Sequence, residues 1–480
     1  MAETQNNVPI LNRKEWQTMM PAPTITAAGG FVINDNANQH RFALYVITVA
    51  IHYLYDHEND DWLPIASGAF GGTFGAGACG TFCDWSLPFV ANGGSTSTIT
   101  VASATYNING LVIGKTVEFT SGNNIGLRRT ITAILNLGGT GTTTLTFDSV
   151  VGTAVANNDT FRIASGMFYV LIPGTLSATT FRKYDIATGS WTSCTSTGLP
   201  ATWGTDGKMV TPGMFGVSYD SGTAAATSST TTLDCTGKTW TADQWINYQV
   251  RITGGTGIGQ VRVITDNDTD TLTFAAGTDL DETSTFVIEG DENAIYVLGN
   301  NAVTMYKYSI SANTWATVAP TTARVGAPIA GMSGEFVGVT GDTGWADITN
   351  IKNGRYIYSF RGGTSVLDRF DIAGGTAGAG AWLAITYQPS LTTFATGSGV
   401  DWSGKYLYIG KEGTAAIPQR FYAFSVVDNT MIPITTDWYL GGVALLGGRV
   451  WIRYLSSAGL VKWLYCLQST STNLRRIMLF

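Results

Sequence analysis

The sequence is poor in charged residues and in histidine. Charged side chains make up 13% of the 480 residues, and the three histidines are His40, His52 and His57. An average soluble protein has about 25% charged residues. Catalytic sites need concentrated titratable groups, and the chain has no G-x-S-x-G nucleophile elbow and no credible Cys/His pairing. We therefore expect a protein that is not an enzyme and holds no cofactor.

Cysteine is also scarce, and its spacing excludes the common metal sites. Of five scattered cysteines only Cys79 and Cys83 are close, with no second pair to complete a zinc site. The aspartates within 266–270 resemble the start of a calcium loop, but Thr271 and Gly277 stand where an EF-hand needs Gly and Glu. The sequence thus predicts no metal site. It also favours folding in a reducing cytoplasm, because no disulfide framework is visible.

Basic clusters and long apolar runs are missing as well. The balance of 27 basic and 34 acidic residues gives a net charge of −7, with no basic face beyond two arginine doublets. The chain starts without the basic and apolar regions of a signal peptide. Its longest apolar run, 42–55, is shorter than the roughly 18 residues that a membrane helix needs. We expect no sequence-specific nucleic-acid binding, no membrane insertion and assembly in the cytoplasm.

What the sequence does contain is typical of β-structure. It has 58 Gly, 20 Tyr and 14 Trp, together with many Thr, a mixture that suits pleated strands and tight turns. A repeat places an aromatic residue six residues before a Trp, across a polar turn between two strands. Both rings can then fill the space between neighbouring sheets. The pairs are Tyr55 with Trp62, Tyr184 with Trp191, Tyr308 with Trp315, Phe370 with Trp382 across a turn five residues longer, and Phe424 with Met431.

Tyr465 and Thr472 keep the same spacing and make a degenerate sixth copy. Aromatic-rich strands stand before these turns, for example FYVLIP from position 168 and KYLYIG from position 405. This arrangement resembles the kelch repeat, although most copies lack its double Gly and the last two lack the Trp. The resemblance implies a kelch-like β-propeller of about six blades.

A second repeat lies inside the first. Residues 117–132 match residues 250–265 in pattern, and each copy has a Thr-rich strand before it and a strand pair after it. Each copy spans enough alternating strand pattern for a small β-barrel or β-sandwich. The predicted organisation is an N-terminal extended segment at 1–29, blade regions at 30–95, 166–227 and 291–480, and inserted modules at 96–165 and 228–290.

The inserted modules resemble β-modules of bacteriophage virion proteins. Short-tailed phages also carry a propeller-bearing tail nozzle of about this size. The resemblance implies a virion structural protein, most specifically a tail nozzle or tail-hub component, that forms a homo-oligomeric ring, such as a hexamer, as scaffold and DNA conduit. Its partners would be the tail adaptor, fibres or neighbouring copies. We assign interface positions to two arginines in each module: Arg128, Arg129, Arg251 and Arg262.

Three alternatives remain open. A capsid decoration or head-fibre protein would be a monomer or trimer that binds capsid. A glycan- or receptor-binding propeller would carry a concave aromatic patch. A sialidase-like hydrolase is the least favoured, because the single imperfect Asp-box turn at 340–345 is a structural motif and the arginines are scattered.

Overall fold

The computed structural model describes most of the chain. The described residues are 17–21, 23, 31–33, 42–46, 52–57, 59–65, 79–86, 88–102, 112–137, 141–172, 174–177, 180–203, 208–212, 218–298, 303–324, 336–337, 355–360, 364–388, 399–402, 406–411, 420–426, 428–434, 450–454, 462–467 and 474–479. This part of the chain is all-β: its strands pair antiparallel, and its one helical element is the 3₁₀ turn η3 (Thr376–Gly378).

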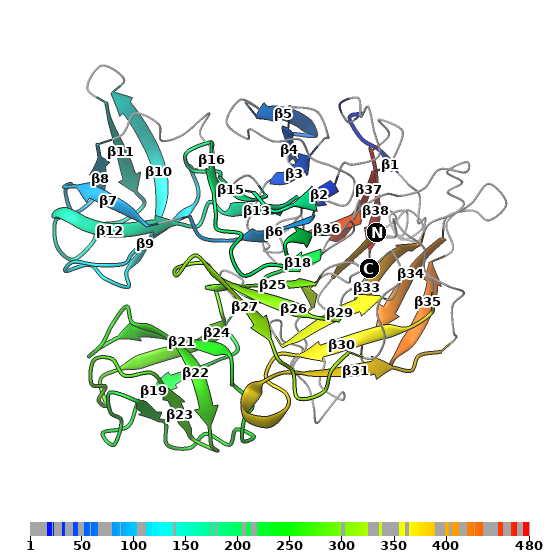
Figure 1. Ribbon diagram of the computed structural model, residues 1–480. Helices are drawn as coiled ribbons and strands as arrows, with labels where there is room; N and C mark the ends of the chain where they lie inside the picture. Colours follow the sequence, from blue (N-terminus) through cyan, green and yellow to red (C-terminus); the bar gives the residue numbers. More distant parts are fainter. Residues whose placement is uncertain are drawn as a thin grey trace, which may run out of the picture.

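Six sheets contain four strands each (Figure 1). Sheet 1 is β2 (Phe31–Ile33), β3 (Phe42–Val46), β4 (His52–Asp56) and β5 (Asp61–Ile65). Sheet 2 is β6 (Cys79–Cys83), β13 (Met167–Leu171), β15 (Phe181–Asp185) and β16 (Ser190–Ser193). Sheet 3 is β18 (Lys208–Val210), β25 (Ala294–Leu298), β26 (Met305–Ser309) and β27 (Thr314–Val318).

The second half of the chain forms the other three. Sheet 4 is β28 (Phe336–Val337), β29 (Tyr356–Phe360), β30 (Leu367–Asp371) and β31 (Ala381–Ile385). Sheet 5 is β32 (Gly399–Trp402), β33 (Tyr406–Lys411), β34 (Arg420–Ser425) and β35 (Thr430–Ile434). Sheet 6 is β36 (Val450–Tyr454), β37 (Lys462–Leu467), β38 (Leu474–Leu479) and β1 (Gln17–Thr18). A small ribbon joins β14 (Gly174–Thr175) to β17 (Thr202–Trp203).

The aromatic pairs of the first repeat stand directly opposite each other on the third and fourth strands of sheets 1 to 4. Their ring centroids are 4.8 Å apart for Tyr55 and Trp62, 5.2 Å for Tyr184 and Trp191, 4.9 Å for Tyr308 and Trp315, and 5.1 Å for Phe370 and Trp382. Phe424 lies opposite Met431 in sheet 5 in the same way. The repeat therefore marks one recurring strand-turn-strand unit.

The sequence predicts that the tryptophans of the repeat fill the space between neighbouring sheets. Trp382 of sheet 4 fills such a space, because it lies in one buried cluster with Val210 and Tyr296 of sheet 3. Trp62 differs from the sequence interpretation, because its indole N–H donates to the Met20 carbonyl at 3.2 Å. The first Trp thus also holds the segment that follows β1, a role that the spacing of the repeat does not predict.

The sixth copy differs from the sequence interpretation as well. Tyr465 lies on β37, the second strand of its sheet, and faces Arg476 of β38; Thr472 is outside the described residues. The fourth strand of sheet 6 is β1, whose Gln17 and Thr18 pair with Arg476 and Arg475. Because the N-terminal segment supplies the outer strand, the last copy needs no aromatic-x6-Trp turn.

Each four-stranded sheet packs against the next along the chain. His52 of sheet 1 meets Trp191 of sheet 2 edge-on at 5.5 Å. Continuous buried clusters join sheets 2 and 3, sheets 3 and 4, and sheets 4 and 5. Strand β32 of sheet 5 lies beside β36 of sheet 6. The rings of Tyr55 and Tyr465, 5.9 Å apart, connect sheet 1 to sheet 6, so the last sheet contacts both the fifth and the first.

The other two sheets have six strands each and share one strand order. Module 1 is β7 (Phe89–Asn92), β12 (Asn157–Ile163), β9 (Thr116–Phe119), β10 (Arg128–Leu137), β11 (Thr142–Phe147) and β8 (Thr98–Val101). Module 2 is β19 (Asp220–Thr223), β24 (Thr285–Gly290), β21 (Tyr248–Gly254), β22 (Val261–Asn267), β23 (Thr271–Phe274) and β20 (Thr232–Asp234). The modules lie beside the four-stranded sheets (Figure 1).

Each module curls around its own core. In module 1 the end of the first strand bonds to the last, through Thr100 N–H to the Gly93 carbonyl at 2.9 Å. In module 2 the Ala225 N–H donates to the Asp234 carbonyl at 2.7 Å. Separate buried clusters fill the two interiors. The first strands, β7 and β19, begin before positions 96 and 228, where the sequence pattern places the modules; the boundaries themselves stay predictions.

Candidate functional site

The two modules touch through equivalent turns. Ile125 and Gly126 of module 1 correspond to Ile258 and Gly259 of module 2. A side chain added at Gly126 would collide with Ile258, and one added at Gly259 would collide with Ile125. Both glycines have positive φ, 78° and 83°, which other residues adopt at a cost. The contact is reciprocal, so the modules pair about a local pseudo-twofold axis.

Module 2 is also held by sheet 4. The Asn247 side chain, at φ 65°, donates hydrogen bonds to the carbonyls of Ile372 at 2.8 Å and Gly378 at 3.0 Å. Both carbonyls belong to the turn between β30 and β31, the longer turn that separates Phe370 from Trp382. The extra residues of this turn thus provide a support for module 2.

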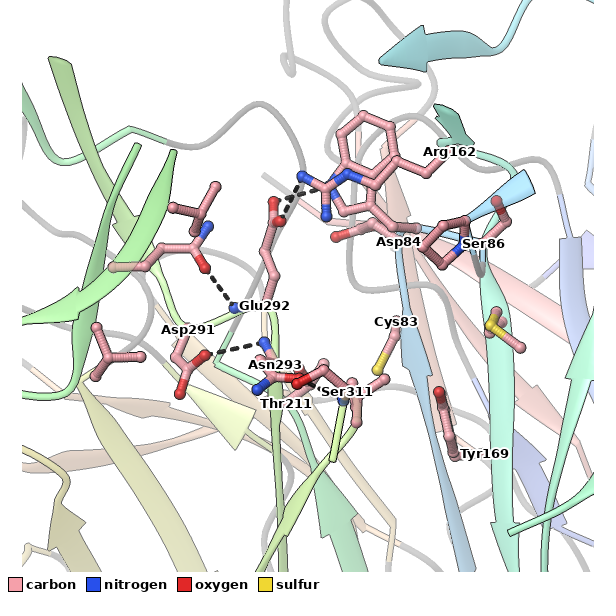
Figure 2. A pocket seen from close by; sticks show the side chains of 17 residues that line it. Cys83, Asp84, Ser86, Arg162, Tyr169, Thr211, Asp291, Glu292, Asn293 and Ser311 are labelled. Carbon is pink, nitrogen blue, oxygen red and sulfur yellow. Dashed lines mark hydrogen bonds and ion pairs between the residues drawn. The ribbon is translucent and has the colours of Figure 1, made fainter. Parts of the chain in front are cut away.

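A cavity of about 510 Å³ opens where the two modules leave sheets 2 and 3 (Figure 2). The junction cavity, as we call it, is lined by Cys83, Asp84, Trp85, Ser86, Pro88, Arg162, Met167, Tyr169, Thr211, Gln249, Val261, Val263, Asp291, Glu292, Asn293, Ile310 and Ser311. These residues come from both modules and both sheets. Only the tertiary structure brings them together.

The residues of the aromatic repeat lie outside this cavity. Trp62 and Trp382, like the other members of the repeat, are absent from its lining. Both are buried, at 9% and 5% exposure, and serve the contacts between sheets and segments described above. The sequence predicts a structural role for the residues of the repeat, and this assignment stays a prediction.

Arg162 and Glu292 line one wall of the cavity and belong to an ion-pair chain that also includes Glu118 and Arg128. Glu118 accepts from Arg128 at 2.6 Å and from Arg162 at 2.8 Å. Arg162 also pairs with Glu292 at 2.9 Å, and Figure 2 shows the two side chains side by side. The Trp85 indole N–H donates to Glu292 at 2.8 Å. Arg162 belongs to module 1, and Glu292 lies between module 2 and strand β25 of sheet 3. The ion pair therefore connects module 1 to the segment that joins module 2 to sheet 3.

Burial acts differently on the two carboxyl groups of this wall. Burial tends to raise the pKa of Glu118, but the guanidinium groups of Arg162 and Arg128 outweigh it and hold that pKa below its usual value. For Glu292 burial is stronger than the attraction of Arg162, and Glu289 and Glu118 add repulsion, so its pKa is raised. A further charge that enters the cavity would therefore change the pKa of these carboxyl groups.

The opposite wall is polar and partly unsatisfied. Asp291 accepts from the Asn293 N–H at 2.9 Å and pairs with Lys307 at 3.3 Å. The Tyr169 hydroxyl is buried, and none of the described residues forms a hydrogen bond with it. Figure 2 shows its hydroxyl end directed toward the cavity. A buried polar group without a partner is costly, which makes this hydroxyl a natural contact for a ligand.

The four arginines assigned to interfaces all lie in the modules. Arg128 pairs with Glu118, and its guanidinium carbon lies 5.3 Å from the centroid of the ring of Trp85, a lining residue of the junction cavity. Arg251 is buried and pairs with Glu289 at 2.6 Å.

The equivalent pair, Arg129 and Arg262, braces loops within the modules. Arg129 donates to the Val150 carbonyl at 2.8 Å, and Arg262 donates to the Thr278 carbonyl at 2.9 Å. Contacts of these arginines with other subunits stay a prediction.

Two histidines and an aspartate near the end of β4 are buried. His52, His57 and Asp56 are all at most 3% exposed. Asp60 accepts from the Met20 N–H at 3.0 Å and the Tyr55 hydroxyl at 2.7 Å, so it anchors the N-terminal segment. In the part of the chain that the structure describes, no group of three metal-ligating side chains comes together, and no helix is long and apolar enough to span a bilayer.

Sequence reasoning missed the junction cavity. Trp85 and Glu292 belong to neither repeat, and nothing in their local sequence pairs them across 207 positions. One signal was available: the equivalent of Arg128 in module 2 is Val261, and the equivalent of Glu118 is Arg251. The two copies of the repeat therefore carry different charges at these two positions.

Comparisons with known proteins do not identify a function. No family model and no curated protein matches the chain. Among solved structures, that of YjhT aligns with 9% identity and a TM-score of 0.37, over 95% of this chain and 95% of that one. That of U3-55K aligns with 7% identity and a TM-score of 0.33, over 96% and 100%. Both share a β-rich fold with this chain at that low similarity.

Proposed function

We propose that sheets 1 to 6 are the blades of a six-bladed β-propeller, kelch-like in construction. The support is the cycle of contacts in which each sheet packs on the next and Tyr465 of sheet 6 packs on Tyr55 of sheet 1. The β1–β38 pairing joins the N-terminal segment to the last blade. Such a closure leaves only short, protected sheet edges, which limits a route to aggregation.

We further propose that the protein is a structural component of a bacteriophage virion, a tail nozzle or tail-hub part that assembles as a ring. The observation that carries this proposal is the duplicated module. Two copies with one strand order are inserted between blades and contact each other through Ile125 and Ile258, and Asn247 holds module 2 against sheet 4. A rigid scaffold with a fixed pair of lateral modules suits contact with neighbouring copies, a tail adaptor or fibres.

Electron microscopy of purified particles tests this function. We expect the protein in a closed ring with sixfold symmetry within the tail, with the paired modules at contacts between subunits. Antibody labelling of a tag placed in the exposed hairpin turn at 268–270 would locate module 2 in that map. A protein that is strictly monomeric and absent from purified tails would refute the proposal; labelling of the head alone would favour a decoration protein instead.

A further inference from the structure

We propose that the junction cavity binds the side chain of an arginine from a partner polypeptide. The cavity volume of about 510 Å³ falls in the range of specific ligand pockets, roughly 300–1,000 Å³. Its charged lining consists of Asp84, Asp291, Glu292 and Arg162. With Lys307, which pairs with Asp291 at 3.3 Å, the formal charge is −1 (two positive and three negative groups). An enclosed negative charge favours a cationic group over a neutral or anionic one.

The apolar side of the cavity suits the stem of that side chain. Val261 and Val263 line it and are 43% and 36% exposed, so an entering apolar group can contact them. Ile310 and Pro88 extend this side. An arginine buries its methylene stem on such a surface while its charged end reaches polar groups beyond. An arginine side chain therefore fits the cavity, because its apolar stem contacts the apolar side while its charged end contacts the polar side.

Polar groups on several sides of the cavity can receive a guanidinium. A guanidinium has five N–H donors in a fixed planar arrangement and accepts nothing. The cavity offers acceptors at Asp84 and Asp291, and the Tyr169 hydroxyl can accept as well. The Tyr169 side chain is buried, and its hydroxyl has no hydrogen-bond partner among the described residues, so an entering donor would satisfy a group that the folded chain leaves unsatisfied.

Two arginines of module 1 already place their guanidinium groups against Trp85, which lines the same cavity. The guanidinium carbons of Arg162 and Arg128 lie 4.1 Å and 5.3 Å from the centroid of the Trp85 ring. In module 2 the position of Arg128 is taken by Val261, an apolar residue that lines the cavity. The cavity therefore lies where the second copy of the repeat omits an arginine that the first copy contains.

A sugar fits these walls less well. Carbohydrate binding relies on a free aromatic face for stacking, but Arg162 covers Trp85 and the Tyr169 ring stacks on Phe181 at 5.8 Å. The proposed arginine site does not depend on the proposal that the protein is part of a virion. A negative result in the test below would therefore leave the virion proposal standing, and absence from virions would leave this site untouched.

The test uses the full chain labelled with 5-fluorotryptophan, with the Trp85 resonance assigned by its loss in Trp85→Phe. The probes are the peptide acetyl-Gly-Arg-Gly-amide and its citrulline counterpart, which has the same shape and no charge. We expect the arginine peptide to shift the Trp85 resonance saturably, and the citrulline peptide to bind at least about tenfold more weakly, as the loss of a charged hydrogen bond implies.

Two variants separate the cavity from the rest of the surface. Val261→Arg restores the residue of module 1 and should fill the cavity with a tethered guanidinium, so binding of the arginine peptide should be lost. Asp84→Asn should weaken binding at least about fivefold by removing one carboxylate. The matched control is Val150→Arg, at a 63% exposed valine of module 1 outside the cavity lining, which should bind like the unmodified chain.

Several results would overturn the assignment. They are equal binding of the citrulline peptide, unchanged binding in the thermally stable Val261→Arg variant, or absence of any saturable shift with the arginine peptide. Saturation of the same resonance by a neutral disaccharide, with no response to the arginine peptide, would identify a sugar site instead.

Discussion

Replacing Trp315 by alanine should destabilise the contact between sheets 2 and 3 more than any change on the surface of those sheets. Trp315 is 8% exposed and packs against Tyr308 of its own sheet and Phe181 of sheet 2, with ring centroids 4.9 Å away in both cases. Its indole N–H donates to the Thr195 carbonyl at 2.9 Å. The residue thus links two sheets through both apolar and polar contacts.

The magnitude follows from these contacts. A buried Trp side chain removes about 200 Å² from water, which at about 25 cal/mol per Å² corresponds to about 5 kcal/mol as an upper estimate. Measured Trp→Ala substitutions in cores cost about 3–5 kcal/mol. We therefore expect Trp315→Ala to lower the free energy of unfolding by about 4 kcal/mol. Trp315→Phe keeps most of the packing but loses the hydrogen bond, and should cost about 1–2 kcal/mol.

Urea unfolding followed by circular dichroism measures both values, with the slope of the transition checked for equality between variants. The matched control is Leu383→Ala, on the equivalent outer strand of sheet 4, where the side chain is 54% exposed; it should change stability by less than about 0.5 kcal/mol. A loss below about 1 kcal/mol for Trp315→Ala would contradict the interpretation that the Trp of the first repeat holds neighbouring sheets together.

Three further perturbations address the modules and the first sheet. Replacing residues 219–290 by a short glycine linker should leave the remaining sheets folded, because Asp220 lies directly opposite Ile288 where the chain enters and leaves module 2; loss of the β-sheet circular dichroism signal per residue would argue against an insert. Gly259→Ala should widen the distance between spin labels on the two modules, whereas Gly237→Ala, also at positive φ but with open space around it, should not; equal distances in both variants would disprove the reciprocal contact. Burial lowers the pKa of His52 to about 4, below its unfolded value of about 6.5, so its contribution to stability is complete above pH 6.5 and is lost as pH falls toward 4, by up to about 3 kcal/mol; a His52→Leu variant with the same acid sensitivity as the unmodified chain would refute this.

Local patterns in the sequence were enough to predict the elements that recur. The aromatic-x6-Trp spacing predicts a strand pair across a turn, and the registers of Tyr184 with Trp191 and of Tyr308 with Trp315 have that form. The apolar run 42–55 forms β3 and β4, as its β-branched and aromatic composition predicts. Such features depend on contacts between residues close in sequence, so periodicity and turn chemistry contain the information.

The sixth copy shows where this reasoning fails. Spacing alone placed Tyr465 in the same role as Tyr308, but Tyr465 lies one strand earlier in its sheet. The strand that completes the sheet comes from residues 17–18, more than 450 positions away in the sequence. No local pattern distinguishes a strand that ends a sheet from one that receives a distant partner. The contact of Trp62 with Met20 has the same origin, since it depends on where that distant segment lies.

Antiparallel strands in two nested repeats could be predicted from the order of amino acids, because strand alternation, aromatic spacing and turn residues are local properties. The pairing of the two modules through Ile125 and Ile258 could not, nor could the cavity that their bases enclose with Trp85 and Glu292. Those contacts depend on how whole sheets pack. Packing is set by the summed burial of many side chains, and no single segment of the sequence records that sum.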